Sequence, residues 1–280
     1  MSRFDRYLYQ LARPVPLRTL AVRKLLRKLP IGSYEGRLHA GAVHRPSYGW
    51  CLYYAARQAK ALGYSAITAV ELGVAGGNGL VCLCRHRDEI KKALGVEVIL
   101  AGFDAGTGMP ASNDLRDVLY FWPPGVFEMD RKALEARIAG RAELVIGNVA
   151  DTVGRWNPRP DAPLGAIMFD LDYYTSTMAA FAFFAKQSVL PRIWCYFDDI
   201  SAGPDAALTD RIGEGEAISH FNGMPERKML NDHLAPAKAF KGVDPEGWHP
   251  HIYIYHRLSH PQYNNNVFTR SETEYLRLSA

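Results

Sequence analysis

The sequence predicts an α/β protein: a mostly parallel sheet with helices on both faces, preceded by a basic helical arm. Two observations predict this class. Short apolar segments recur along the 280 residues, and segments of helical character separate them. The composition agrees, because 48% of the residues are hydrophobic and 22% are charged, which is typical of a folded globular chain and excludes general disorder. No apolar run reaches the roughly 18 residues that a membrane-spanning helix needs.

The elements alternate from residue 49 onward. A first helix is expected over 49–62, because Gly63 is placed to end it. Apolar runs predict five strands, at 67–72, 96–103, 144–149, 165–169 and 193–197. Helices are expected between them, at 80–94, 131–139 and 177–189. The alternating stretch HIYIYHRL at 251–258 predicts a late strand near the sheet edge.

Two parts are therefore expected, a basic arm with an irregular connecting segment (1–48) and one α/β domain (49–280). The positive charge lies in the arm: residues 1–30 contain eight Arg or Lys residues and one Asp, so they carry +7. The whole chain carries +4, so the remainder carries −3. This distribution gives no indication of a nucleic-acid function spread over the whole surface.

The arm contains one expected amphipathic helix, between Pro16 and Pro30. Two interpretations are open. The helix binds an anionic membrane surface or an acidic partner, which places the protein at the inner face of a membrane. Alternatively, it packs on its own domain or on a second copy of the chain in a homo-oligomer. Its apolar stripe consists of Val22, Leu25, Leu26 and Leu29.

The cysteines and the N-terminus both predict a cytoplasmic protein. No cysteine lies in a CxxC pair, so a zinc site is not indicated. The N-terminus has no uninterrupted apolar core of the kind that a signal peptide needs. We expect four reduced and mostly buried thiols, at Cys51, Cys82, Cys84 and Cys195.

In parallel sheets, ligands bind at the carboxyl ends of the strands. The first predicted strand ends in ELGVAGGNG, whose glycines let the backbone turn tightly and approach a ligand. A dinucleotide fingerprint would need a third glycine where Asn78 stands, and a second where Ala75 stands, so a nicotinamide-dependent oxidoreductase is disfavoured. Glu71, two residues before Gly73, suits the cationic end of an aminocarboxylate ligand, directly or through water. A plain strand-to-helix turn is the alternative.

Single polar residues end the next two strands. Asp104 can accept hydrogen bonds from both hydroxyls of a ribose, or it can act as a turn or N-cap residue. Asn148 can contact an adenine or ribose edge, and a turn role is equally compatible with its position.

Pairs of carboxylates end the fourth and fifth strands. Asp170 and Asp172 follow one strand, and Asp198 and Asp199 follow the other. Asp170 and Asp198 are 28 positions apart, the length of one strand–helix–strand unit, so their strand ends should lie side by side. Crowded carboxylates require a cation or raised pKa values, and oxygen ligands suit Mg²⁺, Ca²⁺ or Mn²⁺. The alternative is that Asp172 and Asp199 only cap helices.

Four motifs occur in the order ELGVAGGNG, GFDAGTGMP, FDLDYYTST and CYFDDI. Together they resemble the class I S-adenosylmethionine-dependent methyltransferases of the macrocin O-methyltransferase type, over about residues 45–200. The resemblance implies a Rossmann-like sheet with an antiparallel last strand. It also implies methylation of a hydroxyl on a sugar or another natural-product-like molecule, with help from a divalent cation such as Mg²⁺.

The resemblance also implies roles for single residues. Asp172 matches the general base. The metal ligands are matched by Asp170, Asp198 and Asp199. The expected cofactor site consists of Glu71, Gly73, Gly77, Asn78, Asp104, Asn148 and Asp170. The acceptor stays open, because an aromatic segment of the family before the third-strand loop is represented here only by residues 147–149. A non-catalytic protein that binds S-adenosylmethionine is the alternative from another functional class.

Overall fold

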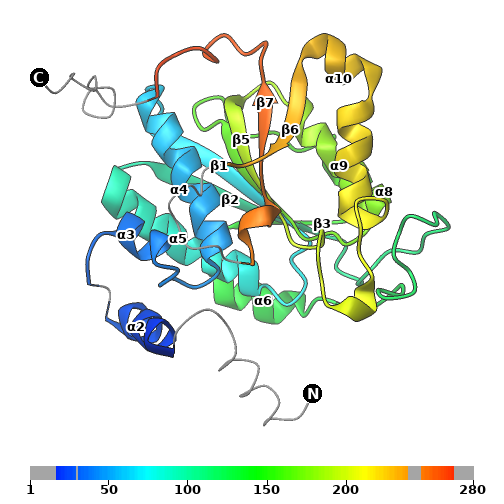
Figure 1. The fold of residues 1–280 in the computed structure, drawn as a ribbon, viewed down its shortest axis with the longest axis horizontal. Coiled ribbons are helices and arrows are strands. Elements are labelled where there is room, and N and C mark those ends of the chain that lie inside the picture. Colours follow the sequence, from blue (N-terminus) through cyan, green and yellow to red (C-terminus); the bar gives the residue numbers. More distant parts are fainter. Residues whose placement is uncertain (1–16, 30, 239–246, 268–280) are drawn as a thin grey trace, which may run out of the picture.

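The computed structural model describes residues 17–29, 31–238 and 247–267 (Figure 1). Its sheet has seven strands in the order β3-β2-β1-β4-β5-β7-β6. β7 runs antiparallel to both of its neighbours, and the other pairs are parallel. The predicted Rossmann-like sheet with an antiparallel late strand is confirmed. The strands are β1 Ala66–Leu72, β2 Glu97–Asp104, β3 Glu143–Ile146, β4 Leu164–Phe169, β5 Val189–Phe197, β6 Asp232–Pro236 and β7 Ile252–Arg257.

Helices cover both faces of the sheet (Figure 1). Side chains alternate along β1, so that Ile67 and Ala69 join the hydrophobic cluster beneath α4–α6 while Val70 and Leu72 join the cluster beneath α7–α9. Burial on both faces explains why these strands are almost continuously apolar. The helices are α2 Leu17–Lys28, α3 Tyr34–His39, α4 Pro46–Ala61, α5 Asn78–Leu94, α6 Arg131–Ile138, α7 Val149–Thr152, α8 Tyr174–Ala180, α9 Gly213–Gly223 and α10 Pro225–Leu230.

Three local expectations are wrong. The strand expected over 144–149 ends at Ile146, because Asn148 caps α7, which begins at Val149. The helix expected over 177–189 ends at Ala180, a 3₁₀ segment follows, and β5 begins at Val189 because that residue pairs with Leu164. The segment expected to be irregular contains α3, whose N-cap Ser33 accepts a hydrogen bond from the Gly36 N–H at 3.0 Å. Buried side chains of α3 belong to the core, so the segment packs on the domain.

The predicted arm helix is present as α2, but its apolar stripe faces outward. Val22, Leu25 and Leu29 are 53%, 52% and 53% exposed. Arg23 Nε donates to the Ala40 carbonyl at 2.7 Å, and Arg27 Nη2 donates to the Gly41 carbonyl at 3.0 Å. The basic side of α2 therefore contacts the domain. The expectation that the apolar stripe packs on its own domain is wrong for the described residues. Residues 1–16 of the expected arm lie outside the described residues.

No described helix combines the length and the apolar character needed to cross a membrane. The four cysteines are free and buried, as predicted.

Candidate functional site

A cavity of about 460 Å³ opens at the carboxyl ends of β1, β2, β4 and β5. The structure brings every residue of the predicted site to its wall, although their individual roles stay predictions. These residues are Glu71, Gly73, Gly77, Asn78, Asp104, Asn148, Asp170, Asp172, Asp198 and Asp199.

The loop between β1 and α5, together with the first turn of α5, packs too closely for side chains at three glycines. Gly73 has φ +81°, and a Cβ there would lie 1.8 Å from the carbonyl oxygen of Asp170. A Cβ at Gly79 would lie 1.7 Å from Glu71 Oε1. Gly77, with φ +75°, caps α5, and its Cβ would lie 2.1 Å from a Leu134 methyl group. Gly73 therefore allows close packing against the metal-ligand candidate Asp170, and Gly79 allows it against the cofactor-ligand candidate Glu71.

Glu71 has an unsatisfied oxygen within this packed wall. Its side chain is buried, and Oε1 accepts a hydrogen bond from the Tyr48 hydroxyl at 3.0 Å. Oε2 is buried without a hydrogen-bond partner. Burial, with a contribution from Asp170, raises the pKa of Glu71 to about 8. An orphaned carboxylate oxygen in a cavity wall suits a ligand that donates hydrogen bonds, such as an ammonium group.

Asp104 holds the loop in place. Its Oδ2 accepts hydrogen bonds from the N–H groups of Val74 at 2.8 Å and Ala75 at 2.7 Å, and Oδ1 accepts from Gly106 at 2.6 Å. Three of its roughly four acceptor positions are thus occupied by the backbone. Binding both hydroxyls of a ribose would require exchange of one of these bonds, so that role stays a prediction.

Both predicted asparagines have local partners. Asn148 caps α7, because its Oδ1 accepts from the Ala150 N–H at 2.9 Å, as the turn alternative predicts. Asn78 Oδ1 accepts from Arg137 Nη2 at 3.2 Å. The amide nitrogen of each asparagine carries the donors that an adenine or ribose edge could use.

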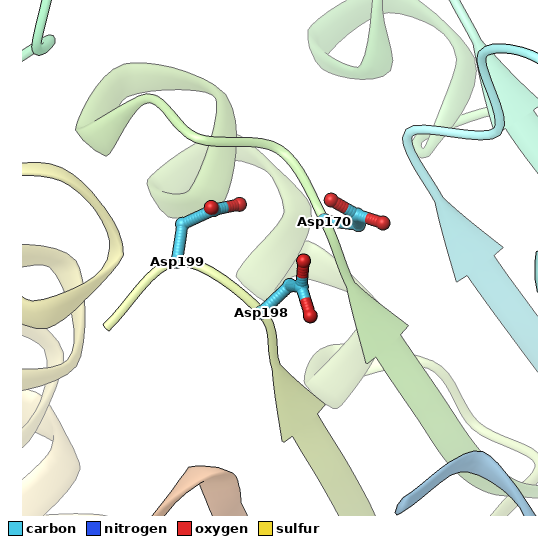
Figure 2. Close-up of side chains that lie close together, drawn as sticks. All are labelled: Asp170, Asp198 and Asp199. Atoms are coloured by element: carbon cyan, nitrogen blue, oxygen red, sulfur yellow. The ribbon is translucent and has the colours of Figure 1, made fainter. Parts of the chain in front are cut away.

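Asp170, Asp198 and Asp199 form a cluster in which one oxygen from each residue lies within 4.8 Å of the others. Figure 2 shows the three carboxylates pointing toward one another from the ends of β4 and β5. Burial and the two neighbouring carboxylates raise the pKa of Asp170 to about 9. Asp199 Oδ2 is buried without a partner. Three carboxylates with one orphaned oxygen fit a hard divalent cation.

Asp172 lies beside this cluster in a strained backbone conformation. Its φ is +59°, which is uncommon for a residue with a side chain. Its carboxyl group shares a hydrogen bond with that of Asp199, and burial raises its pKa to about 8, with help from Asp170 and Glu214. The capping alternative is wrong, because Tyr173 is the N-cap of α8 and the first helical segment after Asp199 begins at Pro204.

Sequence reasoning missed Glu214, in the first turn of α9. It is fully buried, Oε1 accepts from the Leu171 N–H at 3.2 Å, and Oε2 accepts from the Asp199 N–H at 3.0 Å. One side chain thereby joins the two loops that carry the clustered aspartates. The only signal in the sequence is an acidic residue near a helix start, which is common without any function.

The long segment between β2 and α6 was also not expected to contribute. Met109, Trp122 and Phe127 of this segment line the cavity. Asp117 connects the segment to α8 by two hydrogen bonds, which it accepts from the Thr175 N–H at 2.8 Å and the Thr175 hydroxyl at 2.6 Å.

A scan against protein-family models gives no match, and a search of curated proteins gives no significant one. Among solved structures, CalS11, a calicheamicin methyltransferase, superposes with a TM-score of 0.52 at 20% identity, over 93% of this chain and 95% of that chain. The chain has the fold of CalS11. An apo structure of CalS11, a TDP-rhamnose 3'-O-methyltransferase, gives a TM-score of 0.44 at 17% identity, over 93% and 97% of the two chains. The O-methyltransferase TomG from Streptomyces achromogenes gives 0.41 at 14% identity, over 92% and 99%.

Proposed function

We propose that the protein is an S-adenosylmethionine-dependent O-methyltransferase of the macrocin type that uses a divalent cation. One observation carries the proposal: a single cavity combines the glycine loop, the orphaned oxygen of Glu71 and the three-carboxylate cluster. The CalS11 fold supports it, because that fold hosts methyl transfer in CalS11.

The cofactor would lie across the glycine loop. Glu71 offers its unpartnered oxygen to the ammonium group, and Gly73 and Gly77 let the backbone approach the ligand. Asn148 would offer amide donors to the same cavity, whose wall Asp104 also lines. A nicotinamide cofactor remains disfavoured by the residues at positions 75 and 78.

The reacting hydroxyl would lie between the cofactor and the carboxylates. A cation held by Asp170, Asp198 and Asp199 would orient this hydroxyl and lower its pKa. Asp172 would accept the hydroxyl proton, and a pKa raised toward neutrality suits a general base. Bound S-adenosylmethionine would supply the methyl group: the acceptor oxygen would form an O–C bond in line with the breaking S–C bond, and the S–C electron pair would stay on sulfur in S-adenosylhomocysteine.

The sequence resemblance supports a proposal for the acceptor class, and so does the name of CalS11, a calicheamicin methyltransferase. We propose a small hydroxyl acceptor, a sugar or another natural-product-like molecule. The apolar side chains of Met109, Trp122 and Phe127 would cover its less polar face.

Calorimetry with S-adenosylmethionine, S-adenosylhomocysteine and NAD tests the cofactor. We expect the first two to bind and NAD not to bind; the reverse pattern would refute the proposal. Turnover is then followed as S-adenosylhomocysteine release with a panel of hydroxyl acceptors and MgCl₂. Cofactor binding without turnover on any acceptor would favour the non-catalytic alternative.

A further inference from the structure

Arg45 is a charged wall residue that neither the predicted site nor the proposed chemistry uses. It precedes α4 and is exposed at the cavity, and it is the only Lys, Arg or His among the described residues that line the wall. The same wall carries six carboxylates, those of Glu71, Asp104, Asp170, Asp172, Asp198 and Asp199.

The backbone at Arg45 is held in an uncommon conformation. Its φ is +41° and its ψ is 67°, in the left-handed region, and Pro46 follows it. A residue before proline strongly prefers extended backbone, so the fold imposes this conformation against local preference. Strain of this kind is concentrated at functional sites.

Tyr48 places Arg45 and Glu71 in one corner of the cavity. The Arg45 guanidinium carbon lies 4.9 Å from the centroid of the Tyr48 ring, and the hydroxyl of the same tyrosine donates to Glu71. The guanidinium forms no hydrogen bond or ion pair within the described part of the chain, so its donors are available to a ligand. An unused cation therefore lies near a carboxyl group that has one unused oxygen.

This pair of charges matches a zwitterion. The amino-acid end of S-adenosylmethionine carries an ammonium group and a carboxylate on the same carbon. Glu71 suits the ammonium group, and a guanidinium can donate two parallel hydrogen bonds to the carboxylate. We propose that Arg45 binds the carboxylate of the cofactor, so that Arg45 and Glu71 together recognise its amino-acid end. This inference rests on the proposed function.

The test compares two ligands that differ only in that carboxylate, S-adenosylmethionine and decarboxylated S-adenosylmethionine, by calorimetry on the full chain. We expect Arg45→Gln to weaken binding of S-adenosylmethionine about tenfold and to change binding of the decarboxylated ligand less than twofold. Arg45→Lys keeps the charge without the paired donors and should fall between wild type and Arg45→Gln. Arg155→Gln, which removes an exposed arginine outside the cavity wall, is the matched control and should change neither affinity.

If Arg45→Gln weakened the binding of both ligands equally, the assignment would be overturned. The residue would then act through the shape or the overall electrostatic potential of the cavity. Unchanged binding of both ligands would also overturn it, because the carboxylate would then be bound elsewhere. Thermal unfolding of each variant checks that it folds. A wild-type protein that binds neither ligand would remove the proposed function itself, and the assignment with it.

Discussion

Replacing Asp198 with asparagine should stabilise the ion-free protein and remove its response to divalent cations. Asparagine retains the oxygen that accepts the Tyr196 hydroxyl hydrogen bond at 2.6 Å, so the local packing is kept. The substitution removes one negative charge from the cluster of Asp170, Asp198 and Asp199. Carboxylates that lie close together without a cation between them destabilise the folded state.

The size of the effect follows from the geometry. Two ionised carboxylates whose oxygens lie within 4.8 Å of each other repel by at least about 3 to 4 kcal/mol at an effective dielectric constant of about 20. Part of this repulsion is already relieved by protonation, because the pKa of Asp170 is raised to about 9. We therefore expect a net gain of about 1 to 2 kcal/mol, which corresponds to a rise in Tm of roughly 2 to 8 °C.

Thermal unfolding in chelator and in MgCl₂ or MnCl₂ measures both effects. For wild type, an ion at 100 times its Kd should add about 2.7 kcal/mol of stability, and Asp198→Asn should lose most of this gain. Asp205→Asn removes an exposed carboxylate outside the cavity wall and should behave like wild type. A variant that is less stable in chelator and still responds fully to the ion would refute the reasoning.

Four further predictions concern single features. Because burial raises the pKa of Glu71 to about 8, this group keeps a proton in the folded ion-free protein that the unfolded chain releases above about pH 4.5. Glu71 should therefore lower the free energy of unfolding by up to about 1.4 kcal/mol per pH unit as pH rises from about 4.5 to 8. Glu71→Gln should reduce the pH slope by this one-group share in urea titrations at several pH values, while the other carboxyl groups with raised pKa values keep the remainder. Asp172→Asn should lower turnover about 10²–10⁴-fold and keep cofactor and metal binding, and loss of the metal in this variant but not in Asp170→Asn would reverse the assigned roles. Glu214→Gln should weaken metal binding about 10- to 100-fold in metal titrations, with unchanged affinity for S-adenosylhomocysteine, because it disturbs one of two hydrogen bonds to the ligand loops. Deletion of residues 1–30 should leave a folded domain that binds cofactor. The full chain should sediment with anionic liposomes at low salt and be released at high salt, and equal sedimentation of both proteins would exclude the membrane as the partner of α2.

The sheet and the aspartate cluster could be predicted because both depend on local patterns. Apolar runs of strand length mark β1 to β5, and one crossover between Asp170 and Asp198 places their strand ends side by side. The glycine loop was predictable for the same reason, since its composition fits a tight turn. The antiparallel position of β7 came from the family resemblance, and its pairing with β5 agrees with it.

Arg45 and Glu214 could not be assigned from sequence because their roles depend on contacts made by tertiary packing. Glu214 lies on α9, 15 residues beyond Asp199, and only the packing of that helix brings it to two backbone N–H groups. Arg45 lies before α4, far from any predicted strand end. The end of α8 was missed because the sequence is apolar on all sides there, so no polar position marks where the helix stops.

The contact between Gly73 and the carbonyl of Asp170 links the glycine loop to the carboxylate cluster. The backbone of the glycine loop rests directly on the backbone that carries the first carboxylate of the cluster. We therefore expect a ligand that orders one segment also to order the other, so that occupancy of the glycine loop changes the affinity of the carboxylates for an ion. Such linkage is reciprocal in free energy. If bound S-adenosylmethionine changes the affinity for the ion by some factor, the bound ion changes the affinity for S-adenosylmethionine by the same factor. Titrating each ligand in the presence and absence of the other would measure this cooperativity.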